Sequence, residues 1–198
     1  MISDYSDFYQ WMILELPGCP KPVMLQHLKR AFREFAFKTE SWWEELPKTN
    51  LVANQQLYGL LPTYDALIKR INWVRISDGQ QSASHYELKD EFQLKWKDDY
   101  IPSSSTADGL QVKVTMYPDY DNDVIDENYF TRWGDAIMAQ AMYTLMLMPG
   151  HAWTNGDKAQ IYNRDYQEMF NDAVRERVIQ YKGGTPQINL TGPTRRFA

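Results

Sequence analysis

Two proline–glycine breaks, Pro17-Gly18 and Pro149-Gly150, limit which helices the sequence can form. Proline lacks the backbone N–H that a helix interior needs, and glycine readily adopts the left-handed conformation in which many helices end. Each break lies beside a long apolar stripe with helical spacing. Neither break carries a nucleophile, a metal-ligand cluster or a phosphate loop. The sequence therefore favours a protein that assembles over one that catalyses.

The spacing of apolar residues predicts three helices. The first is basic and amphipathic, and it opens at Pro20 and Pro22, where a missing N–H costs nothing. The second runs from about Asp126 to Met148 and ends at Pro149-Gly150. The third begins near Asn155 or Asp157 and runs to residue 181, and the short connection predicts that it packs antiparallel to the second. The stripe of the first helix consists of Val23, Leu25, Leu28, Phe32, Phe35 and Trp42.

The middle of the chain is predicted to form strands, because short runs there are rich in β-branched and aromatic residues and two of them alternate polar with apolar positions. These runs cover residues 56–61, 66–76, 85–88, 92–97 and 110–117. The expected fold class is α+β: a helical bundle of about three to four helices with a small antiparallel β-insertion and an extended C-terminal tail. Residues 1–182 would form a single domain, with a helical frame at 1–50 and 124–182, a β-rich insertion at 51–123, and the tail at 183–198.

Composition excludes several classes of protein. A net charge of −5 argues against a primary nucleic-acid binder, which needs a cationic surface. The lone cysteine, Cys19, excludes an internal disulfide framework. No apolar run reaches the roughly 20 residues of a membrane span, and the polar, acidic start is unlike a secretory signal. Aromatic residues make up 14% of the chain, which indicates either an aromatic core or extensive subunit contacts.

The candidate chemical sites do not match known patterns. The acidic run at 119–127 begins like a calcium-binding loop, but it lacks the turn glycine and ends at Phe130 where the closing glutamate is needed. His27, His85 and His151 lack metal-ligand spacing, and Cys19 is interpreted as a small packed residue. We therefore expect no catalytic, metal-binding or cofactor-binding residues and no cofactor. An enzyme is not expected.

The order of motifs resembles the head–tail adaptor (connector) proteins of tailed bacteriophages. The resemblance is carried by an early Leu-Pro-Gly-Cys-Pro, a helix with Leu28, Ala31, Phe32 and Phe35, the Trp42-Trp43 pair, and a long late helix that ends in Met-Pro-Gly. It continues through Ala152-Trp153-Thr154-Asn155, a helix with Tyr162, Tyr166 and Phe170, and a final Arg195-Arg196-Phe197-Ala198. The layout is similar to that of the tail tubular A proteins of short-tailed phages. The region between Leu51 and Tyr117 matches only in its β character.

The resemblance implies a ring, of twelve copies in this family, that docks on the portal protein and receives the tail or neck proteins. Such a protein is made in the host bacterial cytoplasm and resides in the virion neck, where DNA passes through its lumen and no membrane is involved. The resemblance also implies that the tail reaches into the portal, which assigns portal binding to Gly183, Gly184, Ile188, Leu190, Arg195, Arg196 and Phe197.

Charge distribution suggests complementary patches between subunits. Residues 21–38 carry five cations and one anion, whereas residues 107–135 carry seven acids and two bases. Opposite patches can meet repeatedly around a ring. The candidate interface residues are Lys29, Arg30, Arg33, Asp119, Asp121 and Asp123.

Three alternatives remain open at this point. The first is a tail completion or terminator protein that caps the tail. The second is a small metal-dependent hydrolase that uses His85, His151 and the carboxylates of residues 119–126. The third is a host-encoded interaction module.

Overall fold

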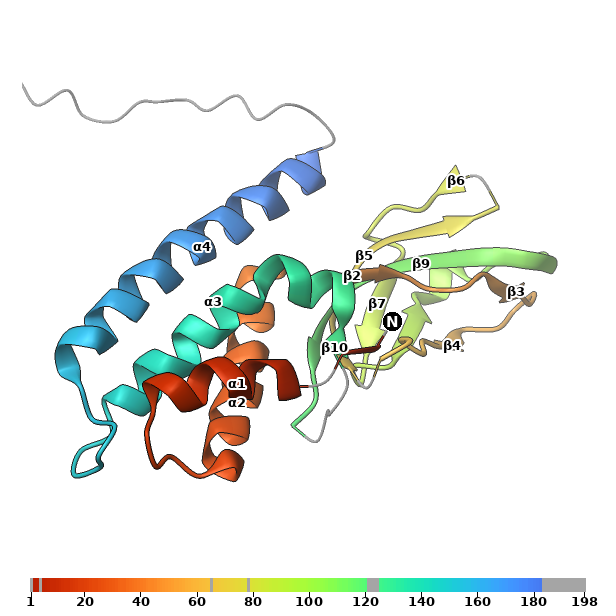
Figure 1. The fold of residues 1–198 in the computed structure, drawn as a ribbon. Coiled ribbons are helices and arrows are strands. Elements are labelled where there is room, and N and C mark those ends of the chain that lie inside the picture. Colours follow the sequence, from red (N-terminus) through yellow and green to blue (C-terminus); the bar gives the residue numbers. More distant parts are fainter. Residues whose placement is uncertain (1, 4, 65, 78, 121–124, 183–198) are drawn as a thin grey trace, which may run out of the picture.

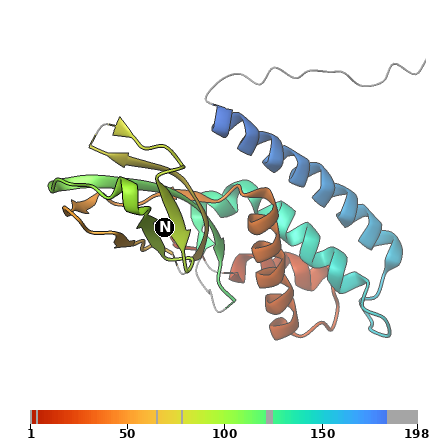
Figure 2. The same ribbon diagram turned by 180° about the vertical axis from the view of Figure 1, so that it is seen from behind.

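The structure is a computed structural model, and it describes residues 2–3, 5–64, 66–77, 79–120 and 125–182. These residues form four α-helices that gather at one end of the molecule, while the sheets lie at the other end (Figures 1 and 2). The helices are α1 (Ser6–Glu15), α2 (Lys21–Thr39), α3 (Glu127–Met146) and α4 (Gly156–Lys182).

Two antiparallel sheets make up most of the β-structure in the described residues. The larger sheet is built around β9, which pairs with β2 and β3 along one edge and with β5 along the other, and β6 extends it beyond β5. The smaller sheet has β8 between β4 and β7. A two-residue pairing of β1 with β10 joins the N-terminus to the start of α3. The strands are β1 (Ile2–Ser3), β2 (Trp43–Glu45), β3 (Thr49–Leu51), β4 (Leu57–Gly59), β5 (Ala66–Ile76), β6 (Gly79–Gln80), β7 (Tyr86–Lys89), β8 (Gln93–Trp96), β9 (Thr106–Pro118) and β10 (Ile125–Asp126).

The expected helical bundle with a small β-insertion is wrong. Strands make up 27% of the described residues, and one of the two antiparallel sheets forms a half-barrel, so the β-structure is a major part of the fold. The segment after α2 was assigned to the helical frame, but it contains β2 and the start of β3. Strands of three residues are too short to show an alternating pattern, and these two form by pairing with β9, more than 50 residues away in sequence.

The main helices and strands lie close to where the sequence predicts them. α2 begins directly after Pro20 and ends at Thr39, and the next residue, Glu40, takes the left-handed conformation (φ 54°). Trp42, which was expected in the stripe of this helix, therefore lies in the segment that follows it. The side chain of Asp126 accepts a hydrogen bond from the Asn128 N–H and caps α3. Asn155 caps α4 in the same way through the Lys158 N–H. Helix α1 was not predicted.

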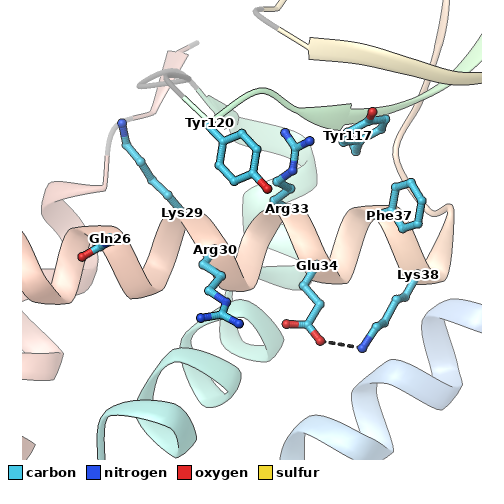
Figure 3. Close-up of a pocket in the computed structure, with 9 residues that line it drawn as sticks. All are labelled: Gln26, Lys29, Arg30, Arg33, Glu34, Phe37, Lys38, Tyr117 and Tyr120. Carbon is cyan, nitrogen blue, oxygen red and sulfur yellow. Dashed lines mark hydrogen bonds and ion pairs between the residues drawn. The ribbon is translucent and has the colours of Figure 1, made fainter. Parts of the chain in front are cut away.

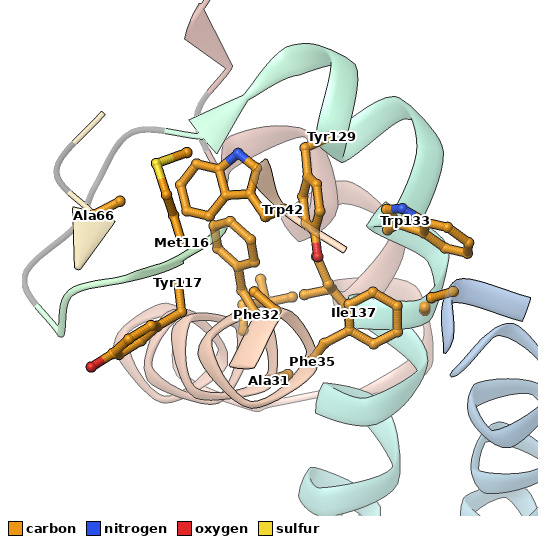
Figure 4. Packing of buried hydrophobic residues seen from close by; sticks show 14 of the residues in the cluster. Ala31, Phe32, Phe35, Trp42, Ala66, Met116, Tyr117, Tyr129, Trp133 and Ile137 are labelled. Atoms are coloured by element: carbon orange, nitrogen blue, oxygen red, sulfur yellow. The ribbon is translucent and has the colours of Figure 1, made fainter. Parts of the chain in front are cut away.

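An aromatic cluster joins the helices to the larger sheet (Figure 4). Phe32 of α2 lies 5.3 Å from Trp42 and 5.5 Å from Tyr129 of α3, measured between ring centroids. One turn further along α2, Phe35 contacts Trp133 of α3 at 5.7 Å. Phe32, Phe35 and Trp42 are almost completely buried. Aromatic pairs at these distances add stabilisation beyond the area they bury.

Glu40 connects three elements through ion pairs. Its carboxylate lies 3.0 Å from Lys69 Nζ and 3.0 Å from Arg70 Nη2, both on β5, and 3.4 Å from Arg177 Nη1 on α4. The Glu40 side chain is only 14% exposed, so it is partly shielded from solvent. Three cations therefore share one carboxylate where α2 ends, and this carboxylate links α4 and β5 to that end.

We predict that Glu40→Gln lowers the free energy of unfolding by about 1–3 kcal/mol, because the neutral amide leaves three neighbouring cations without their shared anion. Chemical denaturation with urea measures the change. The matched control is Glu87→Gln, which breaks the exposed 3.2 Å pair with Lys95 and should cost less than about 1 kcal/mol. Equal effects of the two substitutions would contradict a connecting role for Glu40.

Candidate interaction site

A groove of about 700 Å³ lies between α2 and the end of β9 (Figure 3). We call it the basic groove, because four of its side chains are cationic and one is acidic. Its rim includes exposed aromatic rings: Tyr120 is 72% exposed and Phe37 is 45% exposed. The lining residues are Gln26, Lys29, Arg30, Arg33, Glu34, Phe37, Lys38, Tyr117 and Tyr120.

Arg33 lies at the centre of the contact between α2 and the segment that follows β9. Its guanidinium lies 3.9 Å from the ring centroid of Tyr120 and 4.8 Å from that of Tyr117. Its Nη1 donates a 2.8 Å hydrogen bond to the Pro118 carbonyl and lies 3.7 Å from Oδ1 of Asp119. Arg33 therefore links α2 to the end of β9 within a single chain.

Arg30 and Lys38 differ from Arg33. Lys38 forms a 2.5 Å ion pair with Glu34 one helical turn away, an arrangement that contributes only a few tenths of a kcal/mol on an exposed helix. Arg30 is exposed in the groove, and its positive charge, second to burial, lowers the pKa of His27. The cations that face solvent in this groove can contact an anionic partner without first breaking a buried ion pair.

Tyr117 closes one end of the basic groove and is fixed by its hydroxyl. The hydroxyl donates a 2.6 Å hydrogen bond to Oε1 of Glu91. Burial, followed by this hydrogen bond and the charge of Glu91, raises the pKa of Tyr117 to about 12, although the nearby Arg33 acts in the opposite direction. The ring is therefore neutral at physiological pH and serves as a face for the Arg33 cation.

A second surface lies on α1 and is apolar. Trp11 is 68% exposed and Leu14 is 77% exposed, although Met12 between them points into the core. Cavities of about 330 Å³ and 250 Å³ adjoin Trp11, and both are lined by Met138 of α3. The second cavity also reaches Tyr162 of α4. We call this surface the α1 face.

The predicted interface residues are only partly brought together. Lys29, Arg30 and Arg33 line one groove, as their spacing on α2 implies. Asp119 lies beside Arg33, so this pair of opposite charges is formed within one chain. Asp121 and Asp123 lie outside the described residues. The same holds for the predicted portal-binding residues Gly183, Gly184, Ile188, Leu190, Arg195, Arg196 and Phe197.

The histidines take part in separate local contacts. His27 Nδ1 lies 2.8 Å from the Thr144 hydroxyl and links α2 to α3. His85 stacks on Tyr100, and His151 stacks on Trp153 in the turn between α3 and α4. Within the part of the chain that the structure describes, no three His, Cys, Asp or Glu side chains gather in a group that could hold a metal ion.

Sequence reasoning missed the aromatic part of the basic groove and the α1 face. Tyr117 and Tyr120 flank Pro118-Asp119, so their proximity to an arginine-rich helix could be suspected only once β9 was known to end beside α2. The exposure of Trp11 and Leu14 has no sequence signal of its own, because α1 was not predicted.

Comparison with protein-family models gave no match for this chain, and comparison with curated proteins also gave none. Among the described residues, none of the helices is long and apolar enough to span a membrane.

We predict that Arg33→Glu destabilises the fold, whereas Arg30→Glu leaves its stability nearly unchanged. The first substitution removes the hydrogen bond to the Pro118 carbonyl and both ring contacts, and it places a carboxylate beside Asp119. The expected loss is about 1–3 kcal/mol. Thermal unfolding of the two single variants measures the difference. Similar melting temperatures for both would show that Arg33 does not hold the end of β9 to α2.

Proposed function

We propose that this protein is a structural subunit of the adaptor ring between the portal and the tail of a tailed bacteriophage. In this proposal it forms a homo-oligomeric ring, of twelve copies by the resemblance of its motifs, and becomes part of the channel through which the genome leaves. Its site of action is the virion neck, and its partners are its own copies, the portal protein and the tail or neck proteins.

The observation that supports this most is the α1 face. Single exposed apolar side chains are ordinary, but Trp11 and Leu14 lie together on one short helix with apolar cavities beside them. Trp is also among the residues that contribute most to binding between proteins. In a closed ring, each copy contacts one neighbour through one patch and the other neighbour through a second, different patch. The α1 face would be buried in one of these two contacts in every copy.

The motifs that carry the resemblance have structural roles that fit the proposal. Leu16 and Cys19 are buried in the corner between α1 and α2, and Gly18 turns the chain there with a φ of 80°. Gly150 makes the same kind of turn after α3. Trp153 is buried in that second turn. These residues fix how the four helices are connected, and in the proposal the order of motifs corresponds to a helical framework of the adaptor type.

The tail remains part of the proposal. α4 is the longest helix in the described residues and leads directly into residues 183–198, to which we assign portal binding. This segment contains the spaced apolar residues Ile188, Leu190 and Phe197, together with Arg195 and Arg196, and no acidic residue. A segment of this composition can fold on binding to a partner.

We predict that Trp11→Glu combined with Leu14→Glu prevents contact between copies without unfolding the chain, because both side chains are exposed and charge is costly in an apolar contact. Native mass spectrometry of the protein, alone and bound to portal rings of the phage that encodes it, counts the copies. The control is Leu61→Glu, an exposed site (81%) on the loop after β4. A folded double variant that still forms complete rings would contradict assembly through the α1 face.

We further predict that a variant ending at Lys182 fails to dock on portal rings that the full-length protein occupies. Electron microscopy of each mixture shows whether a ring is seated on the portal. Equal docking of both forms would remove the tail from the portal contact. Binding of the full-length protein to tail ends instead of portal rings would replace the adaptor with a tail completion protein.

A further inference from the structure

The outer face of the larger sheet carries cationic and aromatic side chains. Val74 of β5 and Val112 of β9 are buried in the core, so alternation along each strand directs their neighbours to the opposite face. Strand register places these neighbours side by side: Lys113 is opposite Trp73, and Gln111 is opposite Arg75. On β2, Trp43 is opposite Thr115 and belongs to the same face. We call this surface the outer sheet face.

Two cations on this face lie against two tryptophan rings. Lys113 Nζ is 3.5 Å from the ring centroid of Trp43, and the Arg75 guanidinium carbon is 4.2 Å from that of Trp73. Trp43 remains 39% exposed even with Lys113 beside it. The face therefore offers flat aromatic surfaces and positive charge within one strand spacing of each other.

A polar pocket of about 390 Å³ shares Arg75, the arginine that lies over Trp73, with this face. Its cations are Lys48, just before β3, and Arg75. The other side chains that line it in the described part of the chain are Ser77, Gln80 and Gln111, all of which can donate hydrogen bonds, and among the described residues no carboxylate lines it. Gln80 is directly opposite Arg75 in the pairing of β5 with β6. The pocket has the charge and the donors that an oxyanion requires.

We propose that the outer sheet face binds single-stranded nucleic acid, with phosphate groups in this pocket and bases stacked on Trp43 and Trp73. Proteins that bind single strands combine a cationic path for the backbone with aromatic rings for the bases. An acidic peptide would satisfy Lys48 and Arg75, but it offers no planar rings for the two tryptophans. Nucleic acid offers both features in one ligand.

The net charge of −5 does not prevent this local binding. Among the described residues of the outer sheet face and its pocket, Lys48, Arg75 and Lys113 outnumber Glu45, the acid that lies 3.5 Å from Lys113. At physiological ionic strength, charges more than about 8 Å away are largely screened. The expected binding is therefore weak and strongly dependent on salt. It would hold whether or not the chain forms a neck ring, because it uses neither the α1 face nor the basic groove.

The test is fluorescence anisotropy of a labelled oligothymidylate of about 15 nucleotides, a length within reach of one protein surface. The full-length protein is titrated at several salt concentrations. Lys48→Ala combined with Arg75→Ala should weaken binding about tenfold at low salt and reduce the slope of log K against log[salt] by about 1.4, or about 0.7 for each lost phosphate contact. Trp43→Leu and Trp73→Leu should each weaken binding about fivefold and leave the slope unchanged.

Controls separate nucleic acid from other anions. Arg164→Ala removes one cation from α4, where the side chain is 69% exposed, and should have no effect. An abasic strand of the same length should bind more weakly than oligothymidylate, and poly-glutamate at equal charge should compete much less well than unlabelled oligothymidylate. The proposal is overturned if the oligonucleotide does not bind at low salt, if the Lys48/Arg75 variant binds as the unmodified protein does, or if poly-glutamate competes equally. The last result would identify the face as a site for an acidic protein.

Discussion

The packing of Phe32 and Phe35 against aromatic rings from three other segments is the contact on which the rest of the structure depends. Phe32 touches Trp42, which follows α2, and Tyr129 of α3, while Phe35 touches Trp133 of α3 and lies 6.3 Å from Phe170 of α4. The backbone carbonyl of Trp42 also accepts a hydrogen bond from the Met116 N–H on β9. The helical end and the sheet end are therefore joined through one buried cluster.

This cluster determines where the surfaces lie. α2 buries its apolar side in the cluster, so its cationic side is left to form the basic groove. The central strand β9 reaches the cluster through Met116 and Tyr117, and the carbonyl of its last residue, Pro118, accepts a hydrogen bond from Arg33. The outer sheet face is formed by the side chains of β9 that alternate with those in the core. The core buries one side of α2 and one side of β9, and the opposite sides of these two elements form the interaction surfaces.

Periodicity in the sequence predicted the long elements well. The strand at 66–76 is found with the predicted limits, and α2, α3 and α4 begin within a residue or two of their predicted starts, because Pro20, Asp126 and Asn155 provide local signals. The extent of the β-structure was not predictable in the same way. β2 and β3 depend on pairing with β9, and no local pattern reports a partner that distant.

Of the candidate site, only the positively charged residues could be predicted from the sequence. The spacing of Lys29, Arg30 and Arg33 placed them on one side of a helix, and they do line one groove. Sequence alone did not distinguish the roles of the two arginines, because the difference lies in tertiary contacts: Arg33 reaches the Pro118 carbonyl, whereas Arg30 faces the open groove. The surfaces on α1 and on the outer sheet face required the fold before they could be seen.

Hydrogen–deuterium exchange of the full-length protein, before and after portal rings are added, tests the central claim of assembly at the neck most directly. The account predicts slower exchange on portal binding in residues 183–198 and in α1, with little change in the buried strands β5 and β9, which should already be protected. Unchanged exchange in both the C-terminal segment and α1, at concentrations where the protein is folded, would contradict it.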